Sequence, residues 1–163
     1  MCIRDSLYSG MPQVLGELNV VCKDSVRMSG ISTFCGRVGG QTTPTLTIGN
    51  NVDIGWQNAF SVGRTITLED DVRLAGRVFL AGFPGHPIDC DRRAQGQSDD
   101  ENQIGDIIIK RGAWLGTGVT VLGGVTIGEG AIIGAGSVVT KNIPAFSIAA
   151  GNPANVVKYI KES

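Results

Sequence analysis

The sequence predicts an all-β fold, a parallel β-helix built from six-residue repeats. Aliphatic residues recur every six positions over most of the 163-residue chain, 24 residues are Gly, and only 6% are aromatic. A period of six does not match the 3.6-residue turn of an α-helix, and frequent Gly disfavours helices. A six-residue unit is too short to bury a core alone, so successive units must wind into coils that stack.

The clearest repeats begin at Ile109. A branched aliphatic residue opens each hexad, and the fifth position is mostly small or β-branched, so we expect the opening side chain to point into the core of each coil. The opening residues are Ile109, Leu115, Val121, Ile127, Ile133 and Val139. The fifth residues are Ala113, Val119, Val125, Ala131, Ser137 and Ile143.

The upstream half follows the same rule. Its opening residues are Ile48, Ile54, Phe60, Ile66, Val72 and Val78, preceded by Val14, Val20, Val26 and Val38, with Ser32 as an interruption. The phase slips by about two residues near Pro44. Gly follows the opening residue at positions 49, 55, 116, 128 and 134. A tight corner would require Gly there, for a positive φ or for close backbone approach.

These patterns predict a single domain with first coils over 7–82, a loop over 83–106, later coils over 107–148 and a cap over 149–163. The first six residues, MCIRDS, resemble a translated sequencing adapter, which would make them non-native and leave the true N-terminus undetermined. At the other end, Asn152 is expected to cap a helix that begins with Pro153. Val156, Val157 and Ile160 follow at helical spacing, which predicts a short amphipathic helix over the end of the coils.

Composition excludes several classes of function. The net charge of -1 gives no electrostatic footprint for nucleic acid or an anionic membrane. The longest aliphatic run is Ile107 to Ile109, so no membrane span is expected, and no signal peptide is recognisable. Cys2, Cys22, Cys35 and Cys90 have irregular spacings. They are expected to be reduced thiols in a cytoplasmic protein, without a metal site.

The segment 83–106 breaks the period and holds the only histidine, His86. Pro84, Gly85, Pro87 and Gly96 interrupt regular structure, and 98–102 is polar and acidic. Loops of this length are usually functional or disordered. A neutral imidazole can take a proton near pH 7, and loops on rigid scaffolds often carry functional groups. The alternative is that His86 is simply a solvated residue.

The hexads, together with GHPIDCDRRAQG and GAGSVVTKNIP, resemble the hexapeptide-repeat acyltransferases, close to the galactoside and maltose acetyltransferase branch. The resemblance covers roughly 14–160 and is strongest over 109–158. It implies a left-handed parallel β-helix with three hexads in each triangular coil. In the loop, the matching residues are Gly85, His86, Pro87, Arg93 and Gly96. The resemblance implies that His86 is the catalytic base.

Further site residues follow from the same resemblance. Asn58 and Arg93 are expected to bind the acceptor. Residues expected to bind the acyl donor are Trp114 and Thr117 in GAWLGTGV, Ala135, Thr140 and Lys141 in GAGSVVTKNIP, and Lys158. Relatives often carry two arginines where this chain has Asn155 and Lys158. Asp89 and Glu101 are candidates for orienting His86, the alternative being that both are solvated acids.

The implied activity is transfer of an acyl group, most simply acetyl from acetyl-CoA, to a hydroxyl or amine of a sugar-like acceptor. The family further implies a homotrimer with sites between subunits and no required metal. A zinc hydratase of the γ-carbonic anhydrase kind would need three histidine ligands, and this chain has one. A non-catalytic β-helix scaffold remains as the alternative, although it would not require the G-H-P loop.

Overall fold

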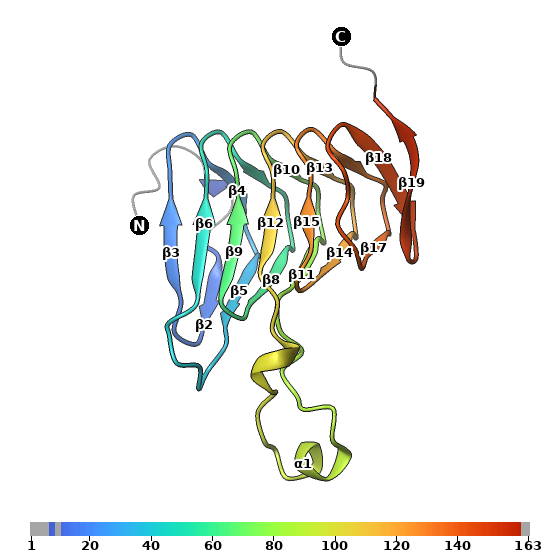
Figure 1. The fold of residues 1–163 in the computed structure, drawn as a ribbon. Coiled ribbons are helices and arrows are strands. Elements are labelled where there is room, and N and C mark those ends of the chain that lie inside the picture. The colour runs from blue at the N-terminus through green and yellow to red at the C-terminus, as the bar shows by residue number, and fades with distance from the viewer. Residues whose placement is uncertain (1–6, 9–10, 161–163) are drawn as a thin grey trace.

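The computed structural model describes residues 7, 8 and 11–160, with side chains over 11–160, and the MCIRDS segment lies outside this range. The chain winds through three parallel sheets that form the sides of a prism (Figure 1). Sheet A holds β1 (Leu7–Tyr8), β4 (Arg27–Ser29), β7 (Asp53–Ile54), β10 (Arg73–Leu74), β13 (Trp114–Leu115), β16 (Ile132–Ile133), β18 (Ser147–Gly151) and β19 (Ala154–Tyr159).

The other two sides contain shorter stacks. Sheet B holds β2 (Gln13–Leu15), β5 (Thr33–Gly36), β8 (Ala59–Val62), β11 (Phe79–Ala81), β14 (Thr120–Leu122) and β17 (Val138–Val139). Sheet C holds β3 (Asn19–Cys22), β6 (Thr45–Ile48), β9 (Thr65–Leu68), β12 (Ile107–Ile109) and β15 (Thr126–Ile127). The chain visits A, B and C in turn up to β17, so the strands inside each sheet pair in parallel with the strand one coil earlier and the strand one coil later. The expected parallel β-helix is confirmed.

The hexad residues fill the interior as expected. All opening and fifth-position residues from Ile109 to Ile143 are buried, as are the opening residues from Ile48 to Val78. Two of the early opening residues are exposed rather than buried. Val38 is 72% exposed because it lies in the β5–β6 loop rather than on a strand, and Val14 is 46% exposed on β2, the end strand of sheet B. Gly55 and Gly116 are required for close approach, since a Cβ on either would lie 2.7–2.8 Å from backbone of the next coil.

Register shows where residues are inserted. Leu115 and Ile133 are paired 18 residues apart, which is three hexads. The pairs Cys22–Ile48, Ile48–Leu68 and Leu68–Ile109 are 26, 20 and 41 residues apart. The additional residues lie in the turns from sheet B to sheet C, at 37–44, 63–64 and 82–106. We call this edge of the prism the B/C corner. The slip near Pro44 is confirmed. The periodicity of the sequence did not reveal a second slip, of two residues, at 63–64.

The predicted C-terminal helix is wrong. Residues 154–159 form β19, which pairs antiparallel with β18 and closes the end of sheet A as a hairpin (Figure 1). The last coil leaves the backbone groups along one edge of β18 without a partner, and an added strand satisfies them. The β-branched pair Val156–Val157 also favours extended backbone over helix. The apolar spacing that suggested a helix therefore serves a strand.

Asn58 occupies an inward position rather than a binding surface. Its side chain is only 1% exposed. Its Nδ2 donates to the Gly55 carbonyl at 2.8 Å, and its Oδ1 accepts from the Val78 N–H at 2.6 Å. Both ends of the amide are thus used to join turns of the coil. The expectation that Asn58 contacts an acceptor is not supported by this placement, and we assign it a structural role.

We predict that Asn58→Ala destabilises the fold and leaves substrate affinity unchanged. The substitution leaves the Gly55 carbonyl and the Val78 N–H without the Asn58 amide as hydrogen-bond partner. This loss is expected to lower the free energy of unfolding by about 1–3 kcal/mol. Chemical denaturation measures the loss, and Asn155→Ala is the matched control because Asn155 is exposed on β19. An increase in the KM for an acceptor without a loss of stability would contradict this role.

Candidate active site

His86 lies at the start of the long loop that leaves the prism at the B/C corner. The loop runs from the end of β11 at Ala81 to the start of β12 at Ile107 and projects well away from the coils (Figure 1). It contains a short helix, α1 (Cys90–Ala94), and a 3-10 turn, η1 (Glu101–Gln103). The extruded loop expected from the sequence is therefore present, and it has local structure of its own.

Local hydrogen bonds give the first half of the loop its shape. Asp89 caps α1 by accepting from the Arg92 N–H at 2.8 Å. Arg93 Nη1 donates to the carbonyls of Pro87 and Ile88, at 3.0 and 2.8 Å. Because these contacts fold Arg93 back onto the residues that follow His86, they give it a role in shaping the loop. An acceptor contact by Arg93 stays a prediction.

The His86 side chain is exposed, between Gly85 and the buried Pro87. Gly85 has φ +81°, a conformation that favours glycine. The backbone carbonyl of His86 accepts from Gln103 Nε2 at 3.3 Å. Within 11–160, neither Asp89 nor Glu101 bonds to the imidazole, since Asp89 caps α1 and Glu101 pairs with Arg37. Neither therefore holds the His86 imidazole by a direct hydrogen bond within one chain.

An ion pair that the sequence analysis missed lies beneath the loop. Arg37 Nε donates to Asp99 Oδ1 at 2.6 Å, and the two side chains are 7% and 2% exposed. Arg37 Nη1 also donates to Glu101 Oε1 at 2.6 Å. Although burial lowers the pKa of Arg37, hydrogen bonds to the two carboxylates raise it overall, so the guanidinium remains charged. Arg37 has no periodic signature, and Asp99 stands among polar residues that looked solvated.

A second ion pair in the loop lies in solvent. Arg92 forms two hydrogen bonds with the Asp100 carboxylate, at 2.8 and 3.0 Å, and both side chains are about 40% exposed. These hydrogen bonds lower the pKa of Asp100 and raise that of Arg92. Exposed pairs of this kind contribute little to stability.

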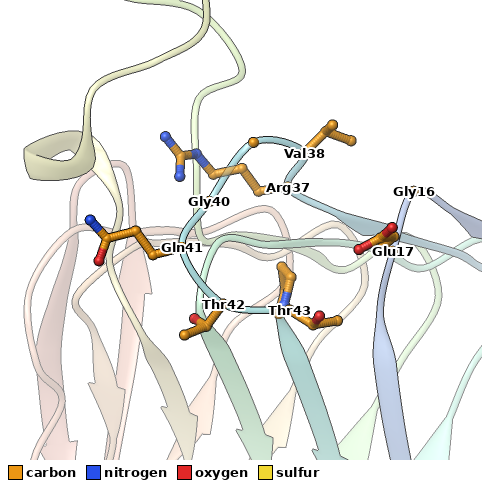
Figure 2. Close-up of a pocket in the computed structure, with 10 residues that line it drawn as sticks. Gly16, Glu17, Arg37, Val38, Gly40, Gln41, Thr42 and Thr43 are labelled. Atoms are coloured by element: carbon orange, nitrogen blue, oxygen red, sulfur yellow. The ribbon is translucent and has the colours of Figure 1, made fainter.

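Two hollows flank the β5–β6 loop at the B/C corner. The larger has a volume of about 460 Å³ and the smaller about 330 Å³. The larger is lined by Gly16, Glu17 and residues 37–44 (Figure 2). The smaller is lined by Arg37, Gly40, Gln41, Thr42, Gly63, Arg64 and Glu101. The lining is mainly glycine and short polar side chains, and Arg37 borders both hollows.

The residues expected to bind the acyl donor lie in three separate parts of the prism. Trp114 is 52% exposed on sheet A. Across the adjacent strands of this sheet it is paired with Ile132, which is paired with Ile148, which in turn is paired with Lys158. Thr117 and Ala135 are exposed in successive turns from sheet A to sheet B, joined by a 2.8 Å hydrogen bond from the Gly136 N–H to the Thr117 carbonyl.

Thr140 and Lys141 are exposed at the B/C corner, two coils beyond the long loop. Sheet B separates this corner from Thr117, and Trp114 lies on yet another side of the prism. One chain therefore does not bring these residues together around His86.

The described part of the chain has neither a helix that could span a membrane nor a cluster of metal-ligating side chains. None of its helices is long and apolar enough to cross a membrane. Among the described residues, no three His, Cys, Asp or Glu side chains gather closely enough to hold a metal ion.

Comparison with known proteins places the fold and the loop in context. Residues 106–141 match the family of bacterial transferase hexapeptide repeats. The chain is 40% identical over 119 residues to a polysialic acid O-acetyltransferase of Escherichia coli O1:K1, a match that covers 69% of this chain and 38% of that protein. It is 36% identical over 98 residues to the galactoside O-acetyltransferase of Escherichia coli K12, covering 60% of this chain and 46% of that enzyme.

Solved structures extend the likeness over most of the chain. A galactoside acetyltransferase in complex with coenzyme A superimposes with a TM-score of 0.73 and 30% identity, over 88% of this chain and 66% of that one. A polysialic-acid-specific acetyltransferase gives a TM-score of 0.68 and 29% identity, over 90% and 68%. The chain spans well under two thirds of the length of the curated relatives. By its repeat and its fold, the chain is a left-handed β-helix of hexapeptide repeats, similar to the acyltransferases that share this fold.

Proposed function

We propose that the protein transfers an acyl group, acetyl in the simplest case, from acyl-CoA to a hydroxyl or amine of a sugar-like acceptor, with His86 as general base. The observation that carries the proposal is the likeness to a galactoside acetyltransferase solved with coenzyme A, which extends over 88% of this chain. The exposed and only imidazole, on a loop at the edge of the same coils, supports it.

In this proposal, His86 accepts the proton from the acceptor O–H or N–H as that atom attacks the thioester carbonyl. The carbon–sulfur bond then breaks, and the proton passes from the imidazolium to the departing thiolate. The products are the acylated acceptor and free coenzyme A, so protons and charge balance. A backbone N–H is the group expected to stabilise the transient oxyanion. An imidazole can take a proton at one nitrogen and return it in a later step, which suits it to both halves of this exchange.

The side chains expected at the acyl donor suit its chemistry. Trp114, with the half-buried Ile132 and Ile148 beside it, offers apolar surface for the pantetheine arm. Lys141 and Lys158 are exposed ammonium groups that can meet phosphates as point charges. Asn155 is uncharged, so it adds no charge toward those phosphates.

We further propose a homotrimer in the cytoplasm, with each site between two subunits. Since His86 and Trp114 lie on different sides of one prism, a site with both needs a neighbouring copy. Sheet B offers an uncharged outer face for such contact, made by Thr33, Cys35, Ala59, Ser61, Phe79, Ala81, Thr120, Leu122 and Val138. The free thiols of Cys22, Cys35 and Cys90 fit a reducing compartment.

Removal of the imidazole tests the base. His86→Ala is expected to lower kcat by about 10² to 10⁴, the usual contribution of general-base catalysis. Release of free thiol from acetyl-CoA, measured with a panel of sugars and amino sugars, provides the rate. Ile88→Ala is the matched control because Ile88 is 79% exposed in the same loop. Full activity in the His86 variant would remove it as the base, and no thiol release with any acceptor would favour a scaffold.

Removal of a single positive charge tests the donor site. Lys141→Ala is expected to raise the KM for acetyl-CoA about three- to fivefold at unchanged kcat, since an exposed ion pair contributes at most ~1 kcal/mol. The difference should shrink at high salt, which screens exposed charges. Lys23→Ala is the control, an exposed lysine at the turn from sheet C to sheet A. Equal effects in both variants would argue against a specific contact.

Dilution tests the shared site. Specific activity is expected to fall as the protein is diluted into the range where sedimentation velocity shows monomers, and to return on reconcentration, because the monomer lacks half of each site. A folded monomer with full activity would contradict a site between subunits.

A further inference from the structure

The outer part of the long loop, residues 83–103, has one polar attachment to the coils. Among the residues that the structure describes, every hydrogen bond between this segment and the coils is donated by Arg37. The bond from the Ile104 N–H to the Glu101 carbonyl stays within the loop. The contacts of Gly105 with Gly82 and of Arg64 with Ile104 join only the base of the loop. The position of the outer loop relative to the prism therefore depends strongly on Arg37.

Asp99 carries this attachment to His86. Its Oδ1 accepts from Arg37 Nε at 2.6 Å, and its Oδ2 accepts from the Gly85 N–H at 2.9 Å. The Asp99 carbonyl also accepts from Arg37 Nη2 at 3.0 Å. Asp99 thus joins the coil, through Arg37, to the residue directly before His86.

A second contact holds the backbone on the other side of the imidazole. Gln103 Nε2 donates to the His86 carbonyl at 3.3 Å, and Gln103 Oε1 accepts from the Asp100 N–H at 2.9 Å. The segment 99–103 therefore contacts both Gly85 and His86. Because Arg37 binds this same segment at two residues, it fixes the backbone from which the imidazole projects.

We propose that Arg37 and Asp99 are positioning residues that set the place of His86 above the B/C corner. The inference rests on the proposed role of His86 as base and assigns its orientation to a buried ion pair that acts through the backbone. A planar guanidinium is required because three of its nitrogens reach three different oxygens, which a lysine cannot do. Because the Asp99 side chain is only 2% exposed, water has little access to replace the guanidinium when Arg37 is substituted.

Conservative variants test the pair by kinetics. Arg37→Gln and Asp99→Asn are expected to lower kcat about 10- to 100-fold, because displacement of a catalytic group by about 1 Å can cost that much. The KM for acetyl-CoA should stay within about twofold, since the donor residues lie elsewhere on the prism. Arg37→Lys keeps the charge and should recover part of kcat. The double variant should be no slower than the slower single variant, since both remove one linkage.

Arg92→Gln is the matched control. It breaks another arginine–aspartate pair in the same loop, but that pair is exposed and does not contact Gly85 or His86. Little change in kcat is expected. Equal losses in the Arg92 and Arg37 variants would overturn the proposal, because any disturbance of the loop would then suffice. Melting curves confirm that each variant is folded at the assay temperature, and Asp99→Asn and Arg37→Lys replace Arg37→Gln if that variant unfolds.

Two measurements need no activity. Exchange of the Gly85 amide hydrogen should accelerate at least tenfold in Asp99→Asn, because an asparagine in its place cannot accept from both Arg37 and Gly85. His86 supplies the only imidazole resonance of an untagged chain, and that resonance should shift in the Arg37 and Asp99 variants but not in Arg92→Gln. Unchanged exchange and an unchanged resonance would overturn the inference.

The two hypotheses can fail separately. If His86→Ala is fully active while Gly85 exchange and the imidazole resonance respond to Asp99→Asn, the base assignment fails and the attachment stands. If His86→Ala is inactive but Arg37→Gln keeps wild-type kcat, the positioning role fails and the proposed function stands.

Discussion

The backbone register between successive coils is the constraint on which the rest of this structure depends. Each strand pairs with a strand one coil away, so an inserted residue within a strand would turn the side chains after it to the opposite face of the sheet. Additional residues are accommodated only where the chain turns. Here the B/C corner holds the inserts 37–44, 63–64 and 82–106, with strict pairing resuming after each. The insertions, including the loop with His86, are therefore gathered at one edge.

The same constraint keeps the interior inert. Inward positions hold apolar residues or small polar side chains that bond within the coil, as Asn58 does to Gly55 and Val78. An amide buried in this way stabilises a turn but cannot reach a substrate. His86 lies on a segment that leaves the prism, and specific contacts with Arg37 hold that segment to the coils.

The sequence predicted the features that recur with the six-residue period, and it did not predict the single features, such as the last strand and the buried ion pair. The hexads from Ile109 located the core because each aliphatic residue meets the same environment as its neighbours. They also indicated the loop at 83–106. The tail at 154–159 was misjudged because its apolar spacing suits a helix, while the free edge of β18 selects a strand. The Arg37–Asp99 pair joins residues 62 positions apart, and no local pattern in one sequence encodes such a contact.

The composition of the loop explains why an ion pair serves as its anchor. Ile88 is 79% exposed, so the outer loop has little apolar surface with which to bind the coils. Apolar contacts also tolerate sliding, whereas the guanidinium fixes direction through three hydrogen bonds. Because an arginine remains charged at any pH at which His86 can act as a base, the anchor does not weaken as the imidazole gains or loses its proton.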